Sequence, residues 1–268
     1  MKIIGEKING TRKMVAKAIA ERNAEFIQNL AKKQVEGGAF WLDINAGTHP
    51  DKEPEDLVWL IRLVQDVVDV PLCLDSANPD ALRIAMKEVK KTPMINSISG
   101  EVIRLNGILP VVVENGCEVI ALCLDDKGIP ATRDARLDVI RKVFEETRQV
   151  GVPDEKVYVD PLAMTIATNT DAGLIIFDTM RAIHAEFPNA HISCGLSNVS
   201  FGLPVRALIN RTFMVYALEA GMDTALIDPN DRELQAAIIA SDLLLGRDKH
   251  CLKYTRAYRA GLLEAKAN

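Results

Sequence analysis

Short apolar runs alternate with longer amphipathic segments along the whole chain. The short runs are rich in β-branched residues and are bounded by polar or turn-forming residues, which is typical of strands buried in a parallel sheet. We predict eight strands, at residues 3–4, 40–44, 72–74, 94–97, 119–124, 157–159, 192–195 and 224–227. No linker or change of composition divides the chain, so we expect one domain over residues 1–268.

The longer segments place apolar residues three or four positions apart, as on one face of a helix. Residues 56–68 follow this pattern through Leu57, Leu60 and Ile61. Similar stripes lie at 26–35, ending at Gly37-Gly38, and at 234–245, ending before Gly246, where glycine can adopt the left-handed conformation that closes a helix. Another helix is expected soon after Pro204, and eight helices should accompany the eight strands.

This alternation predicts an α/β fold with a parallel sheet, which is either open and doubly wound or closed into a (β/α)8 TIM barrel. Polar residues at the predicted strand ends recur about every 31 residues, so that eight units need about 250 residues, as such a barrel does. The segment Gly5-Glu6-Lys7-Ile8-Asn9-Gly10 lacks the glycine spacing of a dinucleotide-binding turn. We therefore predict a single-domain barrel.

Composition excludes several other classes of protein. Of the 268 residues, 48% are apolar and 26% are charged, and the net charge is −5, which argues against a disordered chain and against a nucleic-acid partner. No run is long enough to span a membrane and the start of the chain does not read as a signal peptide, so we expect a cytoplasmic protein. The five cysteines lack metal-binding spacing and are expected to be reduced core residues.

Acids and amides recur where the predicted strands end. The carboxyl ends of barrel strands converge on one mouth, where the chemistry of such barrels takes place. Asp75, Asn96, Asp160 and Asn198 should meet there, although any one of them could instead cap a helix or a turn. We assign that capping role to two other residues, Asp125 and Asp228, because turn-forming residues follow them.

A mouth of carboxylates and amides suits a neutral heterocycle that offers N–H donors. The sequence has no glycine-rich phosphate loop and no convincing lysine at a strand end, which disfavours phosphate ligands and Schiff-base chemistry. The four histidines are scattered without ligand spacing and are expected on the surface, so we predict no bound metal.

Six motifs carry a resemblance to a known family. They are Gly5-Glu6-Lys7-Ile8-Asn9-Gly10, Leu74-Asp75-Ser76, Met94-Ile95-Asn96-Ser97, Asp160-Pro161-Leu162, Gly195-Leu196-Ser197-Asn198-Val199-Ser200 and Leu208-Ile209-Asn210-Arg211-Thr212-Phe213. In this order and spacing, over nearly the whole chain, they resemble the pterin-binding, corrinoid-dependent methyltransferases. That family includes the methyltetrahydrofolate:corrinoid/iron-sulfur protein methyltransferase, the methylcorrinoid protein:tetrahydrofolate methyltransferases and the folate domain of methionine synthase.

The resemblance implies a homodimeric barrel that binds tetrahydrofolate and exchanges a methyl group with cobalamin carried by a separate corrinoid protein. It places Asn198 near N5 of the pterin as the catalytic group, and Arg206 on the folate beyond the ring. Asp75, Asn96 and Asp160 would hold the pterin N–H groups, while the roles of Glu6 and Asp43 stay open. The folate-binding set that the resemblance implies is Asp75, Asn96, Asp160, Asn198, Arg206, Glu6 and Asp43.

One departure from the family bears on the direction of transfer. Phe201-Gly202 follows Ser200 where acetogenic members tend to carry an amide side chain. We therefore favour transfer from the methylcorrinoid protein to tetrahydrofolate in a demethylation pathway. The alternatives are the reverse direction, a non-catalytic folate-binding subunit, a barrel enzyme acting on another heterocycle, and, more distantly, dihydropteroate synthase, whose basic strand-end motif this chain lacks.

Overall fold

The computed structural model describes residues 1–263, and its eight parallel strands lie in the order β7-β6-β5-β4-β3-β2-β1-β8. The last five residues of the expected domain, 264–268, lie outside the described part. The strands are β1 (Lys2–Asn9), β2 (Trp41–Asn45), β3 (Leu72–Asp75), β4 (Met94–Ser99), β5 (Glu118–Leu122), β6 (Val157–Asp160), β7 (His191–Ile192) and β8 (Thr224–Ile227).

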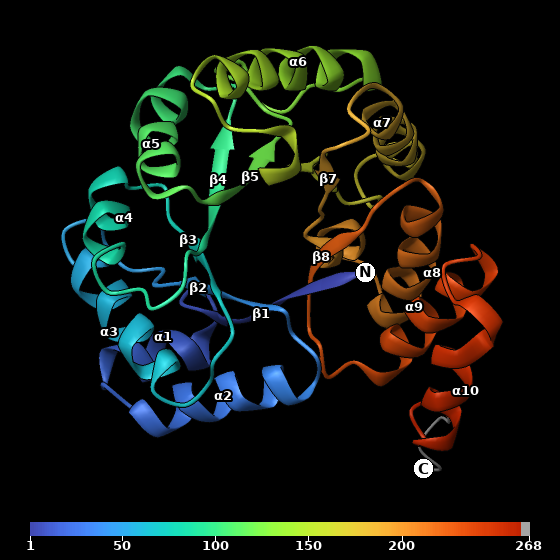
Figure 1. Cartoon of the computed structure of the whole chain (residues 1–268), viewed down its shortest axis with the longest axis horizontal. Coiled ribbons are helices and arrows are strands. Elements are labelled where there is room, and N and C mark those ends of the chain that lie inside the picture. The colour runs from blue at the N-terminus through green and yellow to red at the C-terminus, as the bar shows by residue number, and fades with distance from the viewer. Residues whose placement is uncertain (264–268) are drawn as a thin grey trace.

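The helices form a ring around the strands, as Figure 1 shows, and α10 lies outside that ring next to α9. They are α1 (Lys13–Ala20), α2 (Ala24–Glu36), α3 (Glu53–Gln65), α4 (Pro79–Ala85), α5 (Val102–Asn115), α6 (Arg133–Gln149), α7 (Ala172–Glu186), α8 (Arg206–Glu219), α9 (Arg232–Leu244) and α10 (Leu252–Arg259), with short 3-10 turns η1 (Asp154–Lys156), η2 (Leu196–Ser200) and η3 (Lys249–Cys251).

The two ends of the sheet join and close the barrel. Leu226 N donates to Cys194 O at 3.0 Å and Asp223 N donates to Ile192 O at 3.2 Å, so that β8 continues the sheet next to β7. An isolated parallel bridge between Gly195 and Leu226 extends this contact. The predicted (β/α)8 barrel is confirmed, and the open-sheet alternative is wrong.

The number of helices and several strand limits differ from the prediction. The described residues contain ten α-helices rather than eight, because α1 precedes α2 in the first unit and α10 follows the last. Strand β1 is longer than residues 3–4, since its polar residues also pair with neighbouring strands. Strand β7 ends at Ile192 rather than at 195, because the chain turns there towards η2.

Alternating side chains divide the core into two layers. Inward-facing residues of the strands, among them Trp41, Cys73 and Tyr158, fill the barrel itself. Outward-facing residues such as Leu42 and Leu74 pack against the ring of helices. Nearer the carboxyl ends of the strands, several inward-facing positions are polar, among them Asp43, Asp75 and Asp160, although Leu122 beside Asp160 is apolar.

Two predictions of exposure are wrong. His191, expected on the surface, is half-buried at the amino end of the barrel, where it stacks on Tyr158 with ring centroids 4.4 Å apart and pairs with Asp223 at 2.5 Å. Cys251, expected in the core, is exposed, whereas the other four free cysteines are buried.

A close backbone contact fixes the first loop of the mouth. Gly10 follows β1 and lies against Ala46, which follows β2. A Cβ atom added at Gly10 would sit 1.8 Å from the carbonyl oxygen of Ala46, so only glycine fits there. Within residues 1–263, none of the helices combines the length and the apolar character needed to cross a membrane.

Candidate functional site at the barrel mouth

Three neighbouring strands place a connected set of acids and amides in the mouth. The two-residue period of β2 turns Asp43 and Asn45 to the same side as Trp41, into the barrel. Asn96 of β4 donates through Nδ2 to Asp43 Oδ1 at 3.3 Å, and Asn45 donates through Nδ2 to Asp75 Oδ2 at 2.7 Å. The structure therefore brings together the predicted residues Asp43, Asp75 and Asn96.

Burial disfavours ionisation of the carboxyl groups of Asp43 and Asp75. Burial and the neighbouring charge of Asp75 raise the pKa of Asp43 well above its usual value, although a hydrogen bond from Asn96 opposes the shift. Burial also raises the pKa of Asp75, against the opposing effects of Asn45 and Arg104. A ligand that brings N–H donors to these oxygens would replace hydration that the pair has lost.

Asp160 lies at the end of β6 and is 8% exposed. Its Oδ1 accepts a hydrogen bond from Leu162 N at 2.7 Å and its Oδ2 accepts one from Gly195 N at 3.2 Å. Burial raises the pKa of Asp160 to about 6, while those two N–H groups and the positive charge of Arg136 lower it. Two backbone donors therefore fix the orientation of this acceptor, and its pKa lies above that of an exposed aspartate.

The segment after β7 carries Asn198 into solvent. Asn198 lies in η2 and is exposed, and a Cβ atom added at Gly195 would be 3.4 Å from its side-chain nitrogen. Arg206, at the start of α8, donates through Nη2 to Ser197 O at 2.6 Å and through Nε to Ser200 Oγ at 3.0 Å. The guanidinium of Arg206 thus braces the turn that carries Asn198.

Two cations near the end of β1 are each paired with an acid. Glu6 is paired with Arg12 at 2.7 Å, and Lys7 is paired with Asp228 at 2.6 Å. No convincing lysine was expected near a strand end, whereas Lys7 lies in β1 two residues before its end; Arg12 follows that strand and precedes α1. Glu6 nevertheless acts on Asp43 through its charge, which places it beside the carboxylate pair.

Two functional candidates were missed from the sequence. Asn45 stands two residues after Asp43, so the period of a strand would have placed both on one face. Arg136 lies in a helix and carries no local signal of its role. The turn assignments, in contrast, are confirmed: Asp125 Oδ1 accepts from Lys127 N at 2.9 Å and Asp228 Oδ1 accepts from Asn230 N at 3.0 Å.

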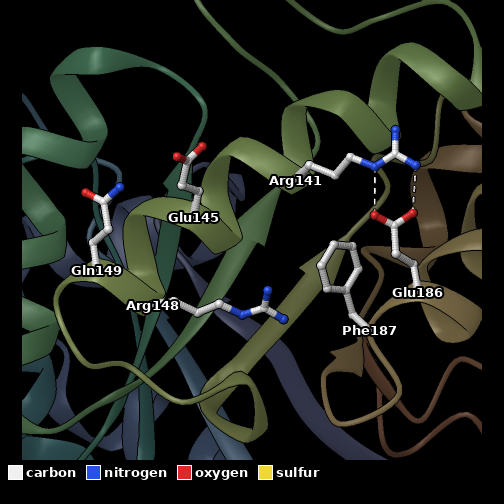
Figure 2. A pocket seen from close by; sticks show the side chains of 6 residues that line it. All are labelled: Arg141, Glu145, Arg148, Gln149, Glu186 and Phe187. Carbon is white, nitrogen blue, oxygen red and sulfur yellow. Dashed lines mark hydrogen bonds and ion pairs between the residues drawn. The ribbon is translucent and has the colours of Figure 1, made fainter.

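A hollow of about 530 Å³ on the outside of the barrel is a separate feature. Arg141 of α6 reaches Glu186 of α7 with two hydrogen bonds of 2.7 Å, and Phe187 lies beside them (Figure 2). Arg148, which also borders the hollow, is bound to Asp154. These arginines are paired already, so this surface joins helices rather than offering cations to a ligand.

The described residues contain no group of three or more His, Cys, Asp or Glu side chains suited to holding a metal ion. Fold and side chains together define a (β/α)8-barrel protein whose mouth presents carboxylate and amide groups to its ligand. The sequence matches the family described as pterin binding enzyme over residues 5–228. The chain belongs to this family, and the resemblance drawn from its motifs is confirmed.

Three similar proteins show how this chain relates to individual proteins. The methylcorrinoid:tetrahydrofolate methyltransferase of Eubacterium limosum is 38% identical over 263 residues, which cover 97% of each chain. The methionine synthase of Mycobacterium leprae is 28% identical over 84% of this chain, which spans only 20% of that longer protein. The dihydropteroate synthase of Yersinia pestis superimposes with a TM-score of 0.69 over 91% of this chain and 93% of its own, and at 16% identity that likeness shows the fold alone.

Proposed function

We propose that this protein is a methyltransferase that moves a methyl group from a methylcorrinoid protein to N5 of tetrahydrofolate. The observation that carries the proposal is the 38% identity, over 97% of both chains, with the methylcorrinoid:tetrahydrofolate methyltransferase of Eubacterium limosum. The acids and amides of the mouth support it, because they are acceptors suited to the N–H groups of a pterin.

We assign the pterin edge to Asp75, Asn96 and Asp160. Asp160 is held by two backbone N–H groups, so its carboxylate is oriented before the ligand arrives. The side-chain amide of Asn45 orients Asp75 by donating to its Oδ2. Buried acceptors fixed at such positions discriminate strongly against ligands that lack the matching donors. We place Glu6 and Asp43 around this edge and Arg206 beyond the ring.

The reaction depends mainly on positioning N5 of tetrahydrofolate in line with the methyl group. Methylcobalt supplies an electrophilic methyl group: N5 attacks the carbon in line, the carbon–cobalt bond breaks with its electron pair left on cobalt as Co(I), and N5 releases its proton to water. The Asn198 amide would stabilise the changing charge at N5 through a hydrogen bond, since an amide does not itself supply or take up a proton.

The corrinoid partner would dock on an apolar rim. Each member of this rim lies in a segment that follows the carboxyl end of β1, β4, β5, β6 or β7, so the set borders part of the mouth, and exposed apolar groups of this kind mark interaction surfaces. Phe201, which is 67% exposed, follows the turn that carries Asn198. The rim consists of Met14, Val102, Ile103, Ile129, Met164, Phe201 and Val205.

We also propose a homodimer in the cytoplasm, with residues 1–268 forming one pterin-binding barrel domain. Exposed apolar side chains on the neighbouring helices α7 and α8, namely Leu174, Leu208 and Tyr216, offer a surface for a second copy. Free cysteines buried in the core accord with a reducing compartment.

The test mixes the protein with tetrahydrofolate and methylcobalamin without oxygen and follows conversion to Co(I) in the visible spectrum. We expect conversion that needs both the protein and the folate. Asn198→Ala should bind tetrahydrofolate but transfer at least tenfold more slowly, whereas Asn189→Ala, an exposed residue near β7, should match the parent. If calorimetry detects no binding of tetrahydrofolate to the parent protein, the proposal is wrong.

A further inference from the structure

A buried arginine lies beneath the mouth without a carboxylate bound to it directly. Arg136, in the first turn of α6, is 4% exposed. Its Nε donates to Pro130 O at 2.9 Å, and its Nη1 donates to Pro161 O at 2.5 Å and to Leu162 O at 3.1 Å. One side chain therefore ties the loop after β5 to the turn after β6.

This position is unfavourable for a cation on two grounds. Removing a guanidinium from water is costly, and arginine is rarely so buried unless an opposite charge compensates it. The first turn of a helix also carries the positive end of the helix dipole, which disfavours a further positive charge. A neutral side chain could fill the same volume, so the charge itself calls for an explanation.

Asp160 is the acid whose charge acts on this arginine. The other groups that face the Asp160 carboxylate are the N–H groups of Leu162 and Gly195 and the thiols of Cys123 and Cys194. Burial raises the pKa of both thiols far above their usual value, so they stay neutral. The charge available to offset an ionised Asp160 is therefore that of Arg136.

We infer that Arg136 is a positioning residue of the pterin site: its guanidinium holds the turn of Asp160, Pro161 and Leu162 and keeps the Asp160 carboxylate in the ionised form that accepts N–H donors. The inference rests on the proposed function for the identity of the ligand. The role of Arg136 requires only that an anionic Asp160 binds the ligand's N–H groups more tightly than the neutral acid does.

The same turn leads on to Asn198. Leu162 has a positive φ of 63°, and its N–H group is one of the two that donate to Asp160, so the hydrogen bond from Arg136 to Leu162 O holds both the turn and this donor in place. A few residues later, Ile166 N donates to Val199 O at 3.0 Å, which attaches this loop to η2. Arg136 thereby supports two of the proposed ligand-binding loops from one point.

The experiment measures the titration of Asp160 directly, in the protein without ligand. Aspartate carboxyl carbons are labelled with ¹³C and followed by NMR against pH, with Asp160→Asn used to assign the signal. The variants are Arg136→Gln and Arg136→Met, which are neutral, and Arg136→Lys, which keeps the charge. Gln retains a donor for one of the carbonyl groups, so a folded neutral variant remains available if Met disrupts the turn. Arg141→Gln removes a charge from the exposed side of the same helix as the matched control.

We expect the neutral variants to raise the Asp160 midpoint by about one pH unit, while Arg136→Lys and Arg141→Gln leave it within a few tenths. In a parallel titration, the neutral variants should bind tetrahydrofolate about fivefold more weakly than the parent at pH 6, about twofold more weakly at pH 7 and equally at pH 9.

The inference is overturned if the midpoint stays unchanged in the neutral variants, or if they lose the same factor of affinity at pH 6 and at pH 9, as a purely structural arginine would cause. The two proposals can fail separately. A parent protein that binds no tetrahydrofolate while its Asp160 midpoint moves as expected would refute the folate function and still support the role of Arg136.

Discussion

Replacing Asp160 by asparagine removes the ionisable group at the end of β6 while keeping its shape and one acceptor oxygen. The Asp160 carboxyl has its pKa raised from the usual 3.8 to about 6 by burial. The folded chain therefore holds this proton more tightly than the unfolded chain does. Stability that is fully present below pH 3.8 is lost as the pH rises from 3.8 through 6, because the unfolded chain gains free energy by ionising while the folded chain either keeps the proton or must bury the carboxylate.

The expected magnitude follows from the two pKa values. One pKa unit corresponds to about 1.4 kcal/mol, so the raised pKa lowers the free energy of unfolding by about 3 kcal/mol at pH 8, where the folded chain buries a carboxylate, and by about 1 kcal/mol at pH 4.5, where only the unfolded chain has ionised. Asparagine does not ionise and therefore avoids this cost. Its NH2 group, however, faces one of the two backbone N–H groups that donate to Asp160, and the loss of that hydrogen bond costs about 1 kcal/mol. Asp160→Asn should thus be about 2 kcal/mol more stable than the parent at pH 8 and equally stable at pH 4.5.

Urea denaturation of both proteins at the two pH values measures these free energies. Asp171→Asn, which changes an exposed aspartate just before α7, serves as the control and should alter stability by less than about 0.5 kcal/mol at either pH. A parent protein that is the more stable one at pH 8, or a difference that does not change with pH, would refute the reasoning. The expected result would mean that Asp160 is kept ionised for binding at the expense of stability.

Three further predictions follow from single contacts. Asn45→Ala removes the donor to Asp75 Oδ2 and should weaken tetrahydrofolate binding about tenfold by calorimetry; an unchanged dissociation constant would exclude Asn45 from the site. Gly10→Ala should destabilise the fold by more than about 2 kcal/mol in urea, whereas Gly173→Ala, whose added Cβ would meet only Phe177 at 3.9 Å, should not; equal stability of the two variants would contradict the close contact with Ala46. Cys251 alone should react rapidly with a thiol reagent in the native protein and all five cysteines after denaturation, and fast reaction of a second thiol before unfolding would disagree with the burial of the other four.

The sequence predicted local elements best where periodicity was long and regular. The stripe at residues 56–68 corresponds to α3 at Glu53–Gln65, and residues 224–227 correspond to β8. The limits of β1 could not be read from its apolar residues, because the polar part of this strand is held by pairing with its neighbours. Short helices such as α1 and α10 were not expected, since eight residues give too little pattern to distinguish them from loops.

What the sequence determined by itself is the succession of strands and helices, the repeat of about 31 residues that favours a barrel, and the strand-end positions of Asp75, Asn96 and Asp160, because these follow from the hydrophobic period and the spacing of elements along the chain. Only the tertiary structure decided the partners of these side chains. Closure of the barrel brings Asn96 to Asp43 across 53 positions of sequence, and the packing of α6 places Arg136 under the turn after β6. Such contacts depend on how strands and helices from distant parts of the chain are set against one another, and the burial that raises the pKa of Asp160 to about 6 arises from the same packing.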